Sequence, residues 1–468
     1  MLGRDDPKRG SRLAALGFLP MLVWWLGWYP GFLSSDSVDQ LQQVASGNFT
    51  NGHPAFHTIS MWFVTRFWDS PAAISLLQII LLALVLAFIA RRLIALGVPL
   101  WLAVGAVWVT TLIPVVAPTA LSLWKDVAFT LAFLWVLAEL LHLIHLGGAY
   151  WDQAWNPVRM GVAPGLVGAY RHNGIITALV MLAALAWAFR RYRRAIVVLA
   201  SVVFGVLVFI QLPLLAIFGV DRSVPAAAEL MLGDVAASLV HEPGNFSSEE
   251  LAYLEEIGPL DAWRAAYTCH NQNPLLFNPD LDIGVIRASP GRMFNLGLRT
   301  LLRDPDTVLG HRVCLTSFLF LPAQPTDSAI GRPPFRVADN DLGITRDPVW
   351  EGAFDLTREL YDFAGDPHHL WYTWRPALVL WLGAITYGLL ARRRLWPLMW
   401  PGFLIGWHAV NVALAALTQE FRLAFPLYLA ALMSLPLVWF AFRPEEARLG
   451  DPQSPIVTGG RALQDRHA

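Results

Sequence analysis

The sequence has little charge for its length. Only 15% of its 468 residues are Asp, Glu, Lys or Arg, whereas 56% are hydrophobic, and the mean hydropathy is +0.48. In soluble domains roughly a quarter of all residues are charged, so this chain is too apolar to be a soluble domain. The formal net charge of -1 gives no electrostatic basis for binding nucleic acid, and we expect no such partner.

Cysteine is almost absent as well. The two cysteines, Cys269 and Cys314, are too few for a thiolate metal cage or a disulfide-rich fold. Both lie in the one long hydrophilic insertion, where a disulfide between them and two unpaired thiols are equally open. The chain has no internal repeat of fixed period, and its tail from residue 444 is polar, as disordered segments are.

Long apolar runs are what the sequence does have. A bilayer-spanning helix needs roughly 17 to 25 residues. Runs of about this length cover 13–33, 71–90, 98–117, 127–146, 174–189, 195–217, 371–391, 396–417 and 423–442. The shorter run 158–169 must also cross if the basic clusters at 91–92 and 190–194 are to lie on the same side of the membrane. Residues 53–69 are too mixed in polarity to cross, and we expect an interfacial or re-entrant helix there. The predicted fold is therefore an all-α polytopic membrane protein with about ten transmembrane helices.

Arginine clusters predict the orientation of these spans. Cytoplasmic loops are enriched in Lys and Arg, and this rule is met if an even number of crossings separates the basic clusters. The clusters lie at 4–12, 91–92, 190–194, 392–394 and 443–448. We therefore expect an integral plasma (inner) membrane protein with both termini in the cytoplasm.

The same topology predicts one large, mainly helical extracytoplasmic domain. Within it, Ser247 to Glu250 form a capping-box pattern, and 299–320 has the pattern of one mixed helix. The expected units are a transmembrane module at 1–219, the extracytoplasmic domain at 220–370, C-terminal transmembrane helices at 371–443 and a cytoplasmic tail at 444–468.

Polar residues gather at the extracytoplasmic ends of different predicted spans. They are Asp36, Asp39, Gln40, His53 and His57 in the first loop, Lys125 and Asp126 in the second, Arg171, His172 and Asn173 in the third, and Glu420 and Arg422 in the last. Each has a structural reading, because acids cap helices and basic side chains anchor span ends to headgroups. External ends should nevertheless be poor in Lys and Arg. Their accumulation beside acids favours a functional site.

This mixture of side chains suits group transfer from a lipid-linked phosphate. Arginine holds phosphate with a bidentate fork and lysine as a point charge, so Lys125, Arg171 and Arg422 are the expected phosphate ligands. A carboxylate can take the proton from an attacking hydroxyl, and Asp36 and Asp39 are the candidates. Their spacing of three residues puts both on one helical face and leaves open which is the base.

These residues also resemble the C-type (GT-C) glycosyltransferases, membrane enzymes that take sugars from polyprenyl-phosphate donors. The resemblance lies in Tyr29-Pro30-Gly31, Asp36 with Gln40, His53-Pro54, Lys125-Asp126, the turn from Arg171 to Gly174, and Glu420-Phe421-Arg422 with Pro426. The chain looks like the poorly characterised bacterial branch of that superfamily. The resemblance implies a hexosyl- or pentosyltransferase with Asp36 as catalytic base and Asp126 as a second acid. It further implies a polyprenyl-phosphate-linked sugar donor and a cell-envelope acceptor that is a glycan, lipid or protein.

Two other classes of protein remain open: a transporter or flippase of a lipid-linked saccharide, and a non-catalytic envelope scaffold. Transporters place ionisable residues near the bilayer midplane, where this sequence has few. Glu139, His142 and His145, near the inner end of one span, fit either packed core residues or a proton relay. We expect no cofactor. A divalent metal is not expected either: His53, His57 and a loop acid could hold one ion by their i, i+4 spacing, but Pro54 disfavours a regular helix through His53.

Overall fold

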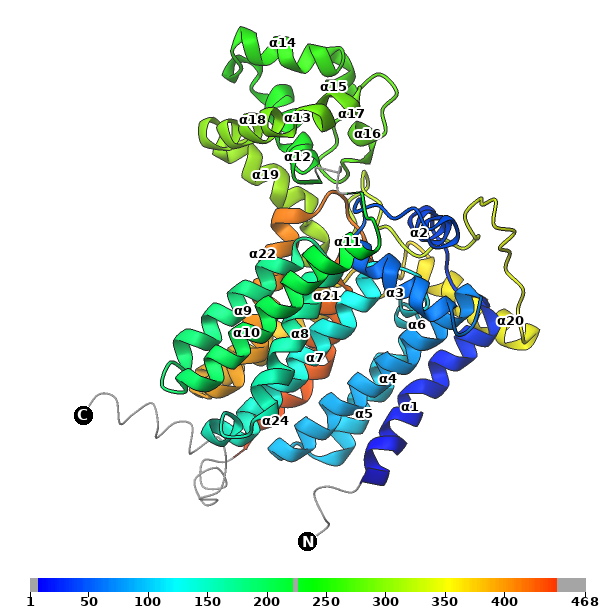
Figure 1. Cartoon of the computed structure of the whole chain (residues 1–468), viewed down its shortest axis with the longest axis vertical. Helices are drawn as coiled ribbons and strands as arrows, with labels where there is room; N and C mark the ends of the chain where they lie inside the picture. The colour runs from blue at the N-terminus through cyan, green and yellow to red at the C-terminus, as the bar shows by residue number, and fades with distance from the viewer. Residues whose placement is uncertain (1–6, 222–225, 444–468) are drawn as a thin grey trace.

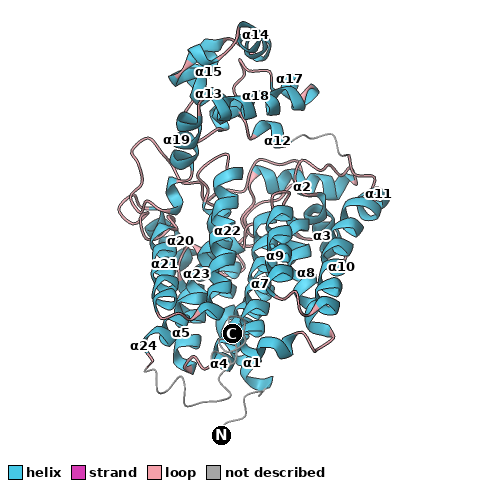
Figure 2. Ribbon diagram, turned by 90° about the vertical axis from the view of Figure 1, so that its left-hand side faces the viewer, coloured by secondary structure: helices cyan, strands magenta, loops and turns pink. Residues whose placement is uncertain are grey.

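The structure is all-helical. This computed structural model describes residues 7–221 and 226–443, and every regular element in these ranges is a helix. Figures 1 and 2 show a bundle of long helices with a smaller helical domain at one end. The bundle contains α1 (Pro7–Gly27), α4 (Pro71–Leu96), α5 (Leu100–Leu112), α7 (Lys125–Leu146), α8 (Trp155–Tyr170), α9 (Gly174–Ala188), α10 (Arg193–Phe209), α21 (Ala377–Arg392), α22 (Trp400–Ala415) and α23 (Phe421–Ser434). Short helical segments continue some of them: η1 (Gly147–Tyr150), η2 (Ile210–Leu214), α11 (Leu215–Ile217), η5 (Trp396–Met399), η6 (Leu435–Val438) and α24 (Trp439–Phe442).

Several bundle helices have the composition of membrane spans. Six described segments are long and apolar enough to cross a bilayer: Gly10–Gly27, Pro71–Leu96, Lys125–Tyr150, Arg193–Ile217, Trp396–Ala415 and Phe421–Phe442. Three shorter apolar helices, α5, α9 and α21, lie in the same bundle. Large apolar side chains such as Leu112 and Trp187 are exposed on the outside of the bundle. Exposed apolar surface of this kind is stable in lipid rather than in water, so the chain is that of a membrane protein.

The short run expected at 158–169 is helix α8, which packs between α7 and α10. Glycines allow the close approach to α10, because a Cβ added at Gly161 would lie 2.8 Å from Val202, and one at Gly165 would lie 2.9 Å from Val206. Small residues at such positions are typical of helix contacts inside a bilayer.

The first helix ends earlier than the apolar run suggested. α1 stops at Gly27, whereas the run continues to residue 33. The chain cannot continue as a helix through Pro30 and Gly31, which has a left-handed φ of 130°. Residues 32–33 instead run beside 121–123, where the Phe32 amide donates to Leu121 O at 3.1 Å and the Leu123 amide donates to Phe32 O at 3.2 Å. This pairing brings the chain after α1 next to the start of α7.

The small domain has its own apolar core, formed by residues that include Val235, Leu254, Trp263, Ile286 and Leu296. Its helices are α12 (Ala226–Glu229), α13 (Leu232–His241), η3 (Pro243–Asn245), α14 (Ser248–Ile257), α15 (Leu260–Ala266), α16 (Asn273–Leu276), α17 (Ile283–Ala288), α18 (Pro290–Arg303), α19 (Pro305–Leu315) and η4 (Ser317–Leu319). A disulfide joins Cys269 to Cys314, which decides the question that the sequence left open.

Two local predictions in this domain have different outcomes. The capping box is confirmed, because the Ser247 hydroxyl accepts from the Glu250 amide and the Glu250 carboxylate accepts from the Ser247 amide. The single helix expected at 299–320 is wrong. α18 ends at Arg303 and α19 begins at Pro305, because proline has no amide proton and its ring clashes with a preceding helical turn.

The remaining elements cover the end of the bundle that faces the small domain. They are α2 (Ser35–Ser46), α3 (Ala55–Thr65), α6 (Val116–Ala120) and α20 (Glu351–Gly365), which packs on α1. The segment expected to be interfacial or re-entrant at 53–69 is therefore the short helix α3. The predicted polar tail at 444–468 lies outside the described residues.

Candidate functional site

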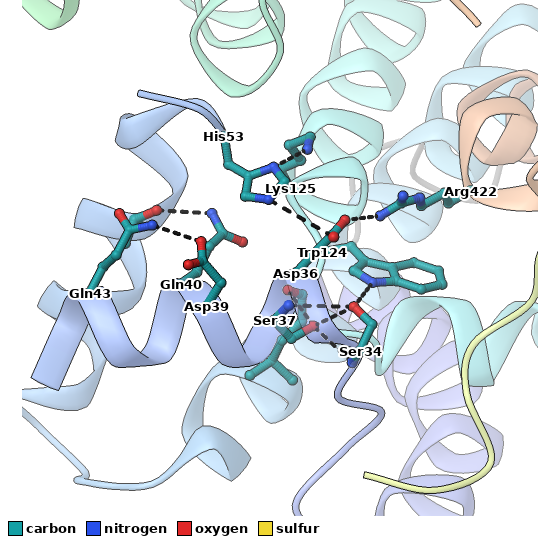
Figure 3. A network of polar contacts seen from close by, with 12 residues as sticks. Ser34, Asp36, Ser37, Asp39, Gln40, Gln43, His53, Trp124, Lys125 and Arg422 are labelled. Atoms are coloured by element: carbon teal, nitrogen blue, oxygen red, sulfur yellow. Dashed lines mark hydrogen bonds and ion pairs between the residues drawn. The ribbon is translucent and has the colours of Figure 1, made fainter. Parts of the chain in front are cut away.

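The start of α2 is fixed against the start of α7. Ser34 caps α2 in a capping box with Ser37, and the Ser37 hydroxyl also donates to Leu123 O at 3.2 Å. The indole of Trp124 donates to the Ser34 hydroxyl at 2.7 Å. These contacts hold Asp36, in the first turn of α2, opposite Lys125, the first residue of α7 (Figure 3).

Asp36 is the centre of a charged network at this point (Figure 3). Its carboxylate pairs with Arg422 Nη1 at 2.6 Å, and its other oxygen lies 3.9 Å from His53 Nε2. Lys125 Nζ lies 2.7 Å from His53 Nδ1. A lysine ammonium can only donate, so His53 Nδ1 accepts and Nε2 carries the proton that faces Asp36. Arg422 is held from its other side by an ion pair with Glu420.

The network determines the protonation states of Asp36 and His53. Burial alone would raise the pKa of the Asp36 carboxyl, but the charges of Arg422 and Lys125 lower that pKa to about 2. Burial and the charge of Lys125 lower the pKa of His53 to about 4. At neutral pH, Asp36 is therefore an anion and His53 is neutral. The side chains of Asp36 and His53 remain 30% and 25% exposed, so a ligand can reach them.

A second ion pair lies beside the first. Arg171, which follows α8, pairs with the buried carboxylate of Asp126. Its guanidinium also lies over the ring of Phe129, at 5.7 Å. Burial and the charge of Lys125 lower the pKa of His57 to about 3, although the charge of Asp126 opposes this fall, so His57 lies within electrostatic range of both residues. The structure thus places the expected residues from four loops around one region.

Other predicted site residues lie apart from these ion pairs. Asp39 is exposed and accepts from Gln43 Nε2 at 2.8 Å, one turn along α2. Gln40 donates to Thr58 and links α2 to α3. His172 lies 3.2 Å from Asn51 O, and Asn173 donates to Asn411 Oδ1 at 3.1 Å. These contacts connect loops and helices.

Sequence reasoning missed Trp124 and Gln419. Trp124 contacts both sides of the network, because its indole binds Ser34 and its ring lies 5.0 Å from the Arg422 guanidinium. An aromatic residue directly before Lys125 was the available signal.

Gln419 belongs to a strap, residues 416–420, that leads from α22 to Arg422. The strap is paired with the small domain on one side, where the Gln272 amide donates to Leu417 O at 2.8 Å. The Gln419 side chain donates to Cys314 O and to Ser317 Oγ, at 3.1 and 3.0 Å. On its other side, the Gly331 amide donates to Gln419 O at 2.7 Å. No local sequence pattern indicates these long-range contacts.

An apolar groove starts at His57. This cavity of about 470 Å³ lies between α3, α4, α7 and α8. It follows α7 from Ala128 to Trp135, about 10 Å at the helical rise of 1.5 Å per residue. Leu81 and Leu84 of α4 line the groove and are also 41% and 52% exposed, so the groove opens at the apolar outside of the bundle.

Among the residues that the structure describes, metal-ligating groups do not converge at this site. In the described part of the chain, the group of His, Cys and acidic residues close enough to share an ion is Cys269, His270 and Cys314. The disulfide occupies both sulfurs of that group. His53 Nδ1 is occupied by Lys125.

Comparison with known proteins gives one similarity. No curated protein and no solved structure matches the chain. A family model covers α3 to α16 together with His53, Lys125, Asp126 and Arg171, and leaves out Asp36 and Arg422. Over residues 44–276 the chain is therefore similar to a family of unknown function, DUF6020.

Proposed function

We propose that the chain is a membrane glycosyltransferase that moves a sugar from a polyprenyl-phosphate donor to an extracytoplasmic acceptor. One observation carries this proposal: a cluster of basic and acidic side chains lies beside His57, at one end of an apolar groove that opens to the outside of the bundle. A lipid-linked phosphate has the same two parts, an anionic group at the interface and an apolar chain below it. Dispersal of the polar residues around the rim would have favoured a scaffold.

In this proposal, Lys125 and Arg422 hold the donor phosphate, and Arg171 supports them. The isoprenoid chain extends from His57 along the groove. Asp36 takes the proton from the acceptor hydroxyl, whose oxygen attacks the anomeric carbon of the sugar. The bond from that carbon to the phosphate oxygen breaks, the configuration inverts, and polyprenyl phosphate leaves with the bonding electron pair.

The Asp36–Arg422 ion pair suggests how the base becomes active. A carboxylate with a pKa of about 2 is a weak base. A donor phosphate that binds Arg422 competes with Asp36 for the same guanidinium. Once displaced, the carboxylate loses its strongest stabilising partner and becomes more basic. The donor itself thus activates the base, and the enzyme without donor keeps Asp36 unreactive.

We infer the topology from the same arrangement. Ten helices would cross the membrane: α1, α4, α5, α7, α8, α9, α10, α21, α22 and α23. The basic residues at 91–92 lie in the last turns of α4, and those at 190–194, 392–394 and 443 lie at or just after the ends of α9, α21 and α24. These helix ends are at the end of the bundle where α1 begins (Figure 1). That end would be cytoplasmic in the plasma membrane, and the small domain would be extracytoplasmic and bind the acceptor. The 16 residues of α8 span about 24 Å, a crossing that requires local thinning.

The test is incubation of the purified protein with a panel of polyprenyl-phosphate sugars and an envelope fraction as acceptor. The wild type should release polyprenyl phosphate, and Asp36→Asn should lower the rate by about 10² to 10⁴. Asp39→Asn is the matched control and should retain activity. Consumption of no donor in the panel would refute glycosyl transfer. Full activity of Asp36→Asn with loss in Asp126→Asn would refute the choice of base.

A further inference from the structure

A second charged cluster lies beyond the other end of the apolar groove. The last groove residue on α4 is Phe88, and the last on α7 is Trp135. One turn further along, α4 carries Arg92 and α7 carries Glu139. The guanidinium of Arg92 lies over the Phe88 ring, 4.5 Å from its centroid. The cluster therefore borders the groove directly.

Glu139 anchors the third charged residue, Arg159 of α8, from behind. Glu139 is fully buried, accepts from the Tyr150 hydroxyl at 2.9 Å and lies 3.5 Å from Arg159 Nε. Asn156 Oδ1 accepts from Arg159 Nη2 at 2.5 Å. The Arg159 side chain is nevertheless 38% exposed. An internal carboxylate thus fixes a guanidinium whose other side faces outward.

Arg92 has no such anchor. No hydrogen bond or ion pair joins it to another residue in the described part of the chain, and its Nε is buried without a partner. It lies within electrostatic range of Arg159 and Glu139. Two arginines against one carboxylate leave a net charge of +1 in the trio. A buried guanidinium donor without a hydrogen-bond acceptor costs folding free energy, so the arrangement favours the binding of an anion.

We propose that Arg92 and Arg159 bind the phosphate of an anionic phospholipid at this end of the bundle. Guanidinium forks match phosphate oxygens, and the exposed leucines of α4 that lead to Phe88 offer a surface for an acyl chain. The site lies at the opposite end of the groove from Asp36 and does not rest on glycosyl transfer. Glu139 serves it by orienting Arg159.

The test compares lipid binding by purified full-length protein in a neutral detergent, using native mass spectrometry. Phosphatidylglycerol should bind about tenfold more tightly than zwitterionic phosphatidylcholine. Arg92→Gln should remove most of that preference and should fold, because Arg92 holds no other described residue in an ion pair or hydrogen bond. Arg159→Lys, which keeps the charge but loses the fork, should reduce the preference by a smaller factor. Arg193→Gln, an exposed arginine at the start of α10, is the matched control and should keep it.

Three outcomes would overturn the proposal. Wild-type preference in Arg92→Gln would show that the arginine does not contact the lipid. An equal loss in Arg193→Gln would show only general attraction to basic surface. Displacement of phosphatidylglycerol by millimolar inorganic phosphate would assign the site to a soluble anion.

Discussion

The replacement Asp36→Asn should strengthen binding of polyprenyl phosphate while it lowers the rate of the proposed transfer. The fall in the pKa of Asp36 from 3.8 to about 2 corresponds to roughly 2 kcal/mol in favour of the carboxylate. Arg422 is its largest favourable partner, so we assign about half of this energy to the ion pair. A phosphate that binds Arg422 must give up that interaction. Without the Asp36 charge, the dissociation constant should fall about fivefold, the equivalent of about 1 kcal/mol.

The assay is titration of the purified protein with a short-chain polyprenyl phosphate, at neutral pH and low salt, in wild type and variant. Asp39→Asn makes the same chemical change on the same helix, but the partner of Asp39 is Gln43. The affinity of this variant for polyprenyl phosphate should therefore stay at the wild-type value. An unchanged or weaker affinity in Asp36→Asn would refute competition for Arg422. Affinity gains of the same size in both variants would point to general electrostatics.

Three further predictions address acid stability, the groove and the small domain. The pKa of His53 falls from 6.5 to about 4 on folding, so the unfolded chain binds more protons between these values, and stability is lost as pH falls from 6.5 towards 4. His53→Gln should therefore lessen the loss of stability between pH 7 and pH 5 by roughly 1 to 2 kcal/mol, seen as a smaller drop in Tm, and an unchanged drop would contradict the assigned environment. Ala128→Phe, which fills the groove one turn below Lys125, should raise KM for long-chain donors at least tenfold, whereas Ala183→Phe on the exposed face of α9 should not; equal effects would exclude the groove as the lipid site. Ser247→Ala removes the cap of α14 and should destabilise the small domain by about 1 kcal/mol in thermal unfolding, and an unaltered Tm would contradict that contribution.

Helix positions could be predicted from the sequence wherever lipid imposes the pattern. The run at 71–90 corresponds to α4, because a bilayer requires a continuous apolar helix of this length. The apolar run did not predict the end of α1, because Phe32 and Leu33 are buried inside the protein rather than in lipid. The backbone of Phe32 pairs there with a segment about 90 residues away. Pro305 indicates the break between α18 and α19. The prediction of one helix over 299–320 gave more weight to the mixed helical pattern than to this proline.

The site residues could be selected from the sequence, but their pairings could not. Positive-inside reasoning brought Lys125, Arg171 and Arg422 to one end of the bundle because each follows or precedes a span. Pairing depends on rotamers and on contacts across the fold, such as Arg422 with Asp36, which are 386 residues apart. Nothing in the local sequence separates Asp36 from Asp39; the direction of α2 does so by pointing one at Arg422 and leaving the other exposed.

The strap at residues 416–420 has a consequence for dissecting this protein. Arg422 follows a segment that is hydrogen-bonded to Gln272, Cys314 and Ser317 of the small domain. Excision of the small domain would therefore also remove the contacts that fix the position of the Arg422 guanidinium. The proposed acceptor and phosphate sites therefore cannot be tested in separate fragments, and inactivity of a truncated bundle would say nothing about where an acceptor binds.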